Sequence, residues 1–253
     1  MGKKIAVSNQ KGGVGKTTTA VNLASALTIF GKKALLADID AQGNACSGLG
    51  LLIGEEQPSM YNVLLMDIPV SETIVKTAIQ GLDLVPVNSH LSGAPIELAE
   101  AEEREFRLFK ALKEVVDTYD YIIIDCPPAL DLLTVNGLTA ADSVLIPIQC
   151  EYYALEGMTK LMRTISLVKE TLNPELSIEG ILLTMYDSRT NLSNQVVEEV
   201  SAYFKEKVFQ TVIPRSVKIS EAPGHGIPID QYDPSGTGSK CYIKLAEELI
   251  NHG

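Results

Sequence analysis

A glycine-rich loop near the amino terminus constrains the fold of this chain more than any other segment. Residues 11–18 read Lys-Gly-Gly-Val-Gly-Lys-Thr-Thr, and they stand between an apolar run at residues 5–7 and a stretch with helical spacing. A strand, a glycine loop and a helix in this order are typical of a phosphate-binding loop. The glycines let the backbone turn and point its N–H groups inward, and the helix start adds partial positive charge there.

The side chains of this loop suit a bound nucleotide and a metal ion. We expect Lys16 to reach the terminal phosphates and the Thr17 hydroxyl to bind Mg²⁺. Backbone groups of the glycines and their neighbours would cradle the other phosphates. The predicted nucleotide-binding residues of the loop are Lys11, Gly12, Gly13, Val14, Gly15, Lys16, Thr17 and Thr18.

Lys11 is an unusual feature of this loop. Gln10 stands where the common pattern has a glycine, and Lys11 follows it directly. Two lysines bring more positive charge than one triphosphate in its own pocket needs. One explanation is that Lys11 crosses to the nucleotide of a second subunit; the alternative is a solvated surface lysine.

Composition argues against several classes of protein. Of the 253 residues 45% are hydrophobic, and the net charge is −11. This acidity argues against a protein that coats nucleic acid, although it leaves room for a local basic face. No apolar run approaches the ~20 residues that span a bilayer, and residues 1–4 leave no room for a signal peptide before the first strand. The four cysteines lack metal-ligand spacing, so we expect a cytoplasmic protein with free thiols.

Apolar runs that suit strands alternate with helical stretches along most of the chain. Near-continuous runs of Val, Ile and Leu are typical of a parallel sheet that is buried on both faces. The alternation predicts a doubly wound, mostly parallel α/β sheet flanked by helices, in one domain over residues 1–253. Strands are predicted at residues 5–8, 33–37, 82–87, 121–124, 144–148, 178–183 and 209–212. Helices are predicted at residues 16–30, 102–117, 155–171, 191–205 and 239–251.

Acidic residues follow two of the predicted strands. Asp38 and Asp40 end the second strand, and Asp125 ends the run at 121–124. A carboxylate directly after a buried strand is costly unless it is used, and ligands of such sheets bind at the carboxyl ends of the strands. We expect Asp125 to hold the shell of the Mg²⁺ ion and Asp40 to orient or polarise the attacking water. The alternative for Asp40 is a turn cap before Gly43.

In combination these motifs resemble those of the deviant Walker ATPases of the ParA and MinD class, and within it those of the ParA and Soj partitioning ATPases. The resemblance covers essentially the whole chain, and the chain resembles the short form of the family, without an N-terminal DNA-binding extension. Ala41 departs from the proline that is usual in the family, which leaves this loop more conformational freedom. The motifs are residues 11–18, Asp-Ile-Asp-Ala-Gln-Gly-Asn at 38–44, Ile-Ile-Ile-Asp-Cys-Pro-Pro at 122–128, Thr-Met-Tyr-Asp-Ser-Arg-Thr-Asn at 184–191, Ile-Pro-Arg at 213–215, Ser-Glu-Ala-Pro at 220–223 and Ser-Gly-Thr-Gly at 235–238.

The resemblance implies a phosphate-loop ATPase that works as a switch with ATP, ADP and Mg²⁺. Lys11 would contact nucleotide across a sandwich homodimer. Lys16, Asp40 and Lys11 would serve catalysis, while Thr17 and Asp125 would hold the metal. The adenine would lie against Met185, Pro214 and Ser216.

The resemblance also implies macromolecular partners. The ATP-bound homodimer would bind double-stranded DNA of the nucleoid without sequence preference, and a ParB-type centromere-binding protein would stimulate hydrolysis and release. Charge alone does not predict this, because residues 1–150 hold 11 Lys and Arg against 18 Asp and Glu, and the remainder holds 10 against 14. We expect the DNA contacts at Arg189, Arg215 and Lys218; the alternative for Arg189 is a solvated loop arginine.

Other classes of nucleotide-binding protein fit the sequence less well. A MinD-like membrane-cycling ATPase, the main alternative, needs a basic amphipathic C-terminal helix, whereas residues 245–253 are acidic and short, so we expect no membrane partner. An iron–sulfur reductase needs paired cluster cysteines. A small-molecule kinase leaves Lys11 and the 38–44 segment unexplained. A non-catalytic module would not need the set Lys16, Thr17, Asp40 and Asp125 together.

Overall fold

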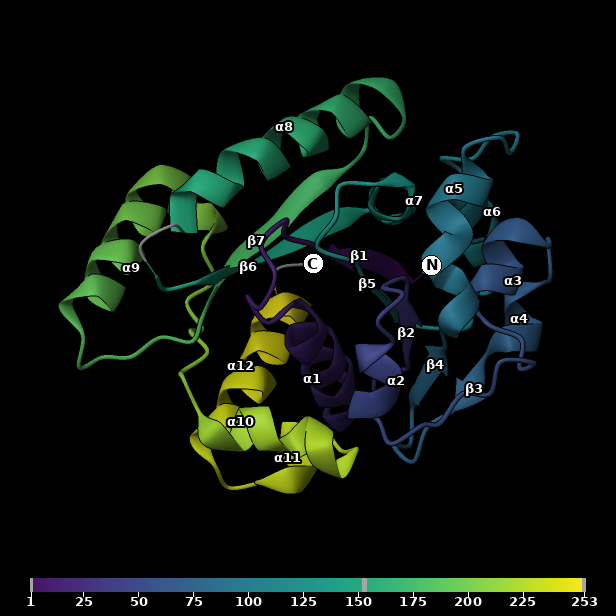
Figure 1. Ribbon diagram of the computed structural model, residues 1–253. Coiled ribbons are helices and arrows are strands. Elements are labelled where there is room, and N and C mark those ends of the chain that lie inside the picture. Colours follow the sequence, from purple (N-terminus) through teal and green to yellow (C-terminus); the bar gives the residue numbers. More distant parts are fainter. Residues whose placement is uncertain (1, 152–153, 252–253) are drawn as a thin grey trace.

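One seven-stranded sheet forms the centre of the molecule. The computed structural model describes residues 2–151 and 154–251, and within them the strand order is β3-β4-β2-β5-β1-β6-β7 (Figure 1). All neighbouring pairs are parallel except β3 with β4 at one edge. The strands are β1 Lys3–Val7, β2 Ala34–Asp38, β3 Val75–Lys76, β4 Leu82–Val85, β5 Tyr121–Asp125, β6 Ser143–Gln149 and β7 Ser177–Thr184.

The sheet is buried on both faces, and this explains its composition. Every residue of β2, β4 and β5 is buried, so the side chains of both faces lie in apolar surroundings. Strands covered on both faces are rich in Val, Ile and Leu instead of alternating with polar residues. The predicted doubly wound, mostly parallel sheet is therefore confirmed.

Helices cover the two faces of the sheet. In Figure 1, α1, α12 and α11 lie below it, while α7 and α8 lie above it with α9 beside α8. The α-helices are α1 Lys16–Ile29, α2 Asn44–Gly48, α3 Met60–Leu65, α4 Val70–Thr73, α5 Ala94–Leu98, α6 Arg107–Leu112, α7 Leu132–Ala140, α8 Ala154–Thr171, α9 Asn191–Phe204, α10 Val217–Glu221, α11 Ile229–Tyr232 and α12 Thr237–Asn251. Short 3₁₀ turns are η1 Ser89–Gly93, η2 Lys205–Lys207 and η3 Ala222–His225.

The strand predicted at residues 209–212 is wrong. Only isolated parallel bridges form on either side of it, at Val208 and Pro214. Between them the Glu248 carboxylate of α12 accepts hydrogen bonds from the backbone N–H groups of Gln210 and Thr211, at 2.7 and 3.0 Å. The segment reaches β7 only at its ends, where the Phe209 and Ile213 N–H groups donate to the Ile181 and Leu183 carbonyls at 3.0 and 2.9 Å. A side chain bonds the residues in between, which sequence periodicity cannot reveal.

The helix predicted at residues 102–117 is shorter in the structure. Only Arg107–Leu112 is α-helical, with turns on both sides. Glu103 has a φ of +49°, a left-handed conformation that interrupts a helix, and the Arg104 guanidinium bonds back to the Ala99 carbonyl at 2.5 Å. The other predicted elements are present, with ends shifted by at most two residues. In the described part of the chain, no helix is long and apolar enough to cross a membrane.

Candidate nucleotide site

The predicted phosphate loop connects β1 to α1 at the carboxyl edge of the sheet. Gly13 and Gly15 have φ values of +74° and +89°, which favour glycine, and a Cβ atom built on either would meet no atom within 4 Å. These glycines are therefore explained by backbone conformation and open space, not by close packing. The buried Lys16 ammonium donates to the Lys11 carbonyl at 3.2 Å, so it folds back over the loop.

Two buried carboxylates lie beneath this loop. β2 and β5 are neighbours, and their last residues, Asp38 and Asp125, stand opposite each other in the register. Both side chains are fully buried. Asp38 accepts a hydrogen bond from the backbone N–H of Asp40 at 2.9 Å. Its other oxygen and both oxygens of Asp125 have no hydrogen-bond partner among the described residues.

The pKa values of this cluster follow from burial. Burial raises the pKa of Asp125 to about 7; the Asp40 carboxylate acts in the same direction, and Thr17 and Lys16 oppose it. Burial also raises the pKa of Asp38, with Asp125 adding to the effect, and lowers the pKa of Lys16. Too little positive charge is present to satisfy the acids.

The residues present fit a magnesium ion. Mg²⁺ prefers oxygen ligands and keeps several waters, so one or two protein groups can hold it. The Thr17 hydroxyl is near enough to Asp125 to affect its pKa, yet the Asp125 oxygens stay unpaired. In the described residues no group of three or more His, Cys, Asp or Glu is arranged to hold a metal by itself. Thr17 and Asp125 therefore suit an ion that takes its remaining ligands from phosphate and water.

Asp40 caps a turn and also borders the cavity beside the phosphate loop. Its carboxylate accepts from the Gln42 N–H at 3.1 Å, as a turn cap does, and its carbonyl accepts from the Gly43 N–H at 2.9 Å. It also lines the same cavity as Lys16 and Thr17. The water-orienting role stays a prediction.

Two adjoining cavities open beside the loop. The first, of 440 Å³, is lined by residues 12–18 except Val14, by the Asp40 loop and α2, and by four residues of the segment 222–228. The second, of 200 Å³, is lined by Met185, Pro214 and Ser216, the three predicted adenine contacts. Met185 borders both cavities.

Not all of the predicted nucleotide-site residues line the cavities, and some residues that line them were not predicted. Val14 is buried, and its carbonyl accepts from the Thr184 hydroxyl at 2.9 Å, so it anchors the loop to β7. Asp125 lies beneath the cavity instead of lining it, and Lys11 does not line it. Sequence reasoning missed the lining residues Ala222 and Pro223, which the Ser-Glu-Ala-Pro motif at 220–223 contained without a role.

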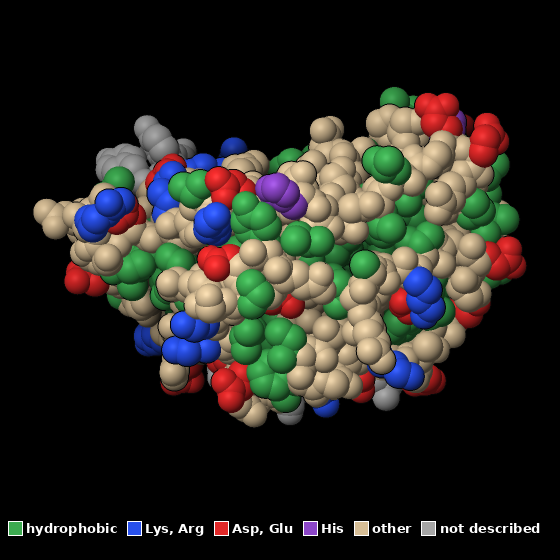
Figure 2. Space-filling model, turned by 90° about the horizontal axis from the view of Figure 1, so that it is seen from below, with side chains coloured by type: hydrophobic (Ala, Val, Ile, Leu, Met, Phe, Trp, Pro, Cys, Tyr) green, Lys and Arg blue, Asp and Glu red, His purple; other side chains and the backbone are tan. Residues whose placement is uncertain are grey.

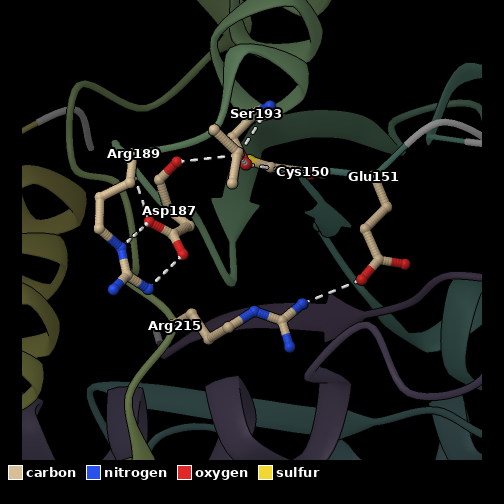
Figure 3. Close-up of polar contacts among 7 residues, drawn as sticks. Cys150, Glu151, Asp187, Arg189, Ser193 and Arg215 are labelled. Atoms are coloured by element: carbon tan, nitrogen blue, oxygen red, sulfur yellow. Dashed lines mark hydrogen bonds and ion pairs between the residues drawn. The ribbon is translucent and has the colours of Figure 1, made fainter.

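The predicted DNA contacts are partly brought together, and each is paired with an acid. Arg189 bonds Asp187 through two nitrogens at 2.9 and 2.7 Å, and Arg215 bonds Glu151 at 2.9 Å (Figure 3). Arg189 holds the pKa of Asp187 down to about 2, with a smaller effect from Arg215. Both arginines therefore lie on the same local surface.

Lys218 lies on α10, three residues after Arg215. Its ammonium is 3.6 Å from Glu221 and 5.2 Å from the centre of the Tyr232 ring. Figure 2, which views the molecule from below, shows Lys and Arg side chains interspersed with Asp and Glu and no broad basic field on that face. Any phosphate contact here has to compete with acids.

Known proteins resemble this chain over its whole length. Residues 2–178 match the family described as AAA domain. The chain is 55% identical to the sporulation initiation inhibitor protein Soj of Bacillus subtilis, over 100% of both chains. It is 54% identical to the chromosome partitioning protein ParA of Myxococcus xanthus, over 99% of this chain and 88% of that one.

A solved structure of similar fold holds nucleotide. Cobyrinic acid a,c-diamide synthase from Mycobacterium smegmatis, with bound ADP and magnesium, is 39% identical with a TM-score of 0.87. The similarity covers 100% of this chain and 95% of that one.

Proposed function

The chain belongs to the ParA and Soj family of partitioning ATPases, and from this premise we propose that it is an ATP-dependent switch that partitions DNA. In this proposal the ATP-bound homodimer binds DNA without sequence preference. Hydrolysis, stimulated by a ParB-type centromere-binding protein, releases it. The observation that carries the proposal is a two-lysine phosphate loop directly above two buried carboxylates with unpaired oxygens.

The nucleotide chemistry assigns a role to each group of this site. Thr17 and Asp125 would hold Mg²⁺, which would supply Lewis-acid stabilisation of the phosphate charge. Lys16 binds the terminal phosphates once it leaves the Lys11 carbonyl, and Asp40 orients the attacking water. Met185, Pro214 and Ser216 enclose the adenine in the 200 Å³ cavity.

Lys11 is assigned to the partner's nucleotide. Its amine has no hydrogen-bond or ion-pair partner in the described part of the chain, and Lys11 does not line the cavity of its own subunit. Lys11→Ala should therefore abolish ATP-dependent dimerisation while leaving nucleotide binding by the monomer. A variant that dimerises as the parent does would remove Lys11 from this role.

DNA binding is assigned to Arg189, Arg215 and Lys218. Each is held by an acid, so the surface of one subunit attracts phosphate weakly, and dimerisation doubles it. A weak patch on an acidic body suits a protein that releases DNA in every cycle. We assign the protein to the cytoplasm, at the nucleoid, with residues 1–253 acting as one ATPase domain.

DNA binding with and without nucleotide tests this function. The purified protein is titrated with duplex DNA of arbitrary sequence, without nucleotide, with ADP and with ATP, at low and moderate salt. The proposal requires binding with ATP that weakens as salt rises, with loss in Lys16→Ala. Binding in no state, combined with ATP-dependent binding to anionic lipid vesicles, would replace it with a MinD-like membrane cycle.

A further inference from the structure

We propose that the contact between Gly50 and Gly226 transmits the nucleotide-dependent position of the Asp40 loop to the residues that bind DNA. The inference rests on the proposed function and adds a coupling element to it. The receiving element is residues 214–228, here called the cover segment. This segment borders both cavities, and it carries Arg215 and Lys218. One stretch of backbone therefore contacts the nucleotide site and presents the DNA contacts.

A continuous chain of backbone hydrogen bonds leads from Asp40 to Gly50. The Asp40 carbonyl accepts from the Gly43 N–H at 2.9 Å, and the Gly43 carbonyl accepts from the Ser47 N–H at 3.2 Å. The Ser47 carbonyl in turn accepts from the Gly50 N–H at 3.1 Å. Residues 40–50, which include α2, therefore move together when Asp40 changes position.

At Gly50 this chain meets the cover segment with no side chain between the two backbones. Gly50 and Gly226 both have left-handed φ values, +70° and +68°. A Cβ atom built on Gly226 would lie 2.6 Å from the Gly50 Cα atom, and one built on Gly50 would lie 3.0 Å from the Gly226 carbonyl oxygen. Contact this close passes on displacement of either backbone, because neither side has a flexible group that can absorb it.

Beyond Gly226 the contact continues to the charged residues. The Gly226 N–H donates to the Pro223 carbonyl at 3.1 Å, which closes η3 directly after α10. The His225 ring stacks on Tyr232 at 4.9 Å, and the Lys218 ammonium lies 5.2 Å from the centre of the same Tyr232 ring. A shift of Gly226 therefore reorients the surroundings of Lys218.

The far end of the segment is fixed. The Ile229 N–H donates to the Asn22 side chain at 2.7 Å, and the Ser25 hydroxyl donates to both Asp230 oxygens, at 2.9 and 3.0 Å. These bonds tie α11 to α1, behind the phosphate loop. A push at Gly226 consequently pivots the cover segment about this anchor.

Gly226→Ala tests the contact, and Gly224→Ala is its matched control. Gly224 lies two residues away in the same segment, without a left-handed φ, and a Cβ atom there meets nothing within 4 Å. For both variants we would measure thermal unfolding, affinity for a fluorescent ATP analogue and DNA affinity with ADP and with ATP. Gly226→Ala should still bind the ATP analogue, but the increase in DNA affinity that ATP causes should be at least about tenfold smaller than in the parent. Gly224→Ala should match the parent in all of these; full ATP dependence in Gly226→Ala would overturn the proposal.

Hydrogen exchange of the unmodified protein keeps the test independent of variant folding and of DNA. The amides of residues 43–50 and of the cover segment should change protection together between the ADP and ATP states. If residues 43–50 respond and the cover segment does not, the contact transmits nothing. If the parent fails to bind DNA in any state, the proposed function fails, and the exchange pattern alone still decides the contact.

Discussion

The strands of the central sheet end at two opposite sides, here called the amino edge, where the parallel strands begin, and the carboxyl edge, where they end. Within the described part of the chain, buried carboxylates are paired at the amino edge, whereas carboxylate oxygens stay unpaired at the carboxyl edge. At the amino edge, Asp83 of β4 is buried and accepts from the Tyr119 hydroxyl and the Lys76 ammonium, both at 2.7 Å. At the carboxyl edge, Asp125 of β5 is buried with neither oxygen paired among the described residues. Of these two buried aspartates in one sheet, the one at the amino edge therefore has hydrogen-bond partners and the one at the carboxyl edge has none among the described residues.

The difference shows which edge has been kept for a ligand. Buried polar groups in proteins are nearly always paired, because an unpaired one costs free energy. Charged and amide groups at the amino edge are also paired: Lys3 pairs with Glu179 at 2.9 Å, and the Asn173 amide donates to three carbonyls at the end of α7. Unpaired carboxylates next to a phosphate loop indicate that a cation completes the carboxyl edge.

The largest expected effect is on catalysis by Asp125→Asn. The amide keeps the size of the side chain but loses the charge that holds the metal, so we expect ATP hydrolysis to fall about 100-fold or more. Ligand-free protein should be no less stable than the parent, because an unpaired buried charge has been removed. Steady-state hydrolysis and urea unfolding measure the two effects. Normal hydrolysis in this variant would remove Asp125 from the metal site.

Asp40→Ala separates chemistry from metal binding within the same edge. We expect turnover to fall about 100-fold, because the water loses its orienting carboxylate. ATP binding and dimerisation should persist and give a long-lived dimer. Single-turnover hydrolysis and sedimentation with ATP check this. The contrary result is turnover at the parental rate.

Asp83→Asn is the matched test at the other edge. The Tyr119 hydroxyl and the Lys76 ammonium lose a charged acceptor, so we expect a loss of about 1–3 kcal/mol in the free energy of unfolding. ATP hydrolysis should stay within about twofold of the parent, since the site lies at the opposite end of the strands. A variant as impaired in hydrolysis as Asp125→Asn would break the contrast between the edges.

The sequence predicted the phosphate loop and every strand of the central sheet except the two-residue β3, because these features depend on local pattern. Apolar runs, three glycines and acids after strands can be recognised within a few residues of chain. The cover segment was not predicted, because its role depends on Gly226 meeting Gly50, about 175 residues away. The strand expected at residues 209–212 failed for a similar reason, since Glu248 bonds the backbone there.

Asp38 shows the same limit inside the site. Its position at the end of a strand was evident from the sequence. That it stands opposite Asp125 in the register of β2 and β5 could be known only from the strand order. Sequence alone gave it no role, whereas the structure shows that it fixes the Asp40 backbone at 2.9 Å.

The comparison of edges also predicts how stability depends on pH. The folded-state pKa of Asp125, about 7, lies above the ordinary value near 4, so folding favours the protonated carboxyl. The stabilisation of the folded state by protonated Asp125 is complete below pH 4 and is lost as the pH rises through about 7. Relative to Asp125→Asn, the ligand-free parent should lose on the order of 2 kcal/mol between pH 5 and pH 8. Urea unfolding of both proteins at each pH measures it, and parallel pH profiles would contradict it.

The smallest expected effect concerns acids that restrain the DNA contacts. Asp187→Asn removes the carboxylate that holds Arg189, so that arginine becomes free to meet phosphate, and DNA affinity with ATP should rise about two- to fivefold at low salt. The gain should vanish at high salt, because exposed charges are then screened. Asp142→Asn is the control: it changes net charge equally, but Asp142 pairs with Lys4 at the amino edge. Equal gains in both variants would mean that net charge alone sets the affinity. A gain confined to Asp187→Asn would mean that a local acid limits how tightly the switch holds DNA.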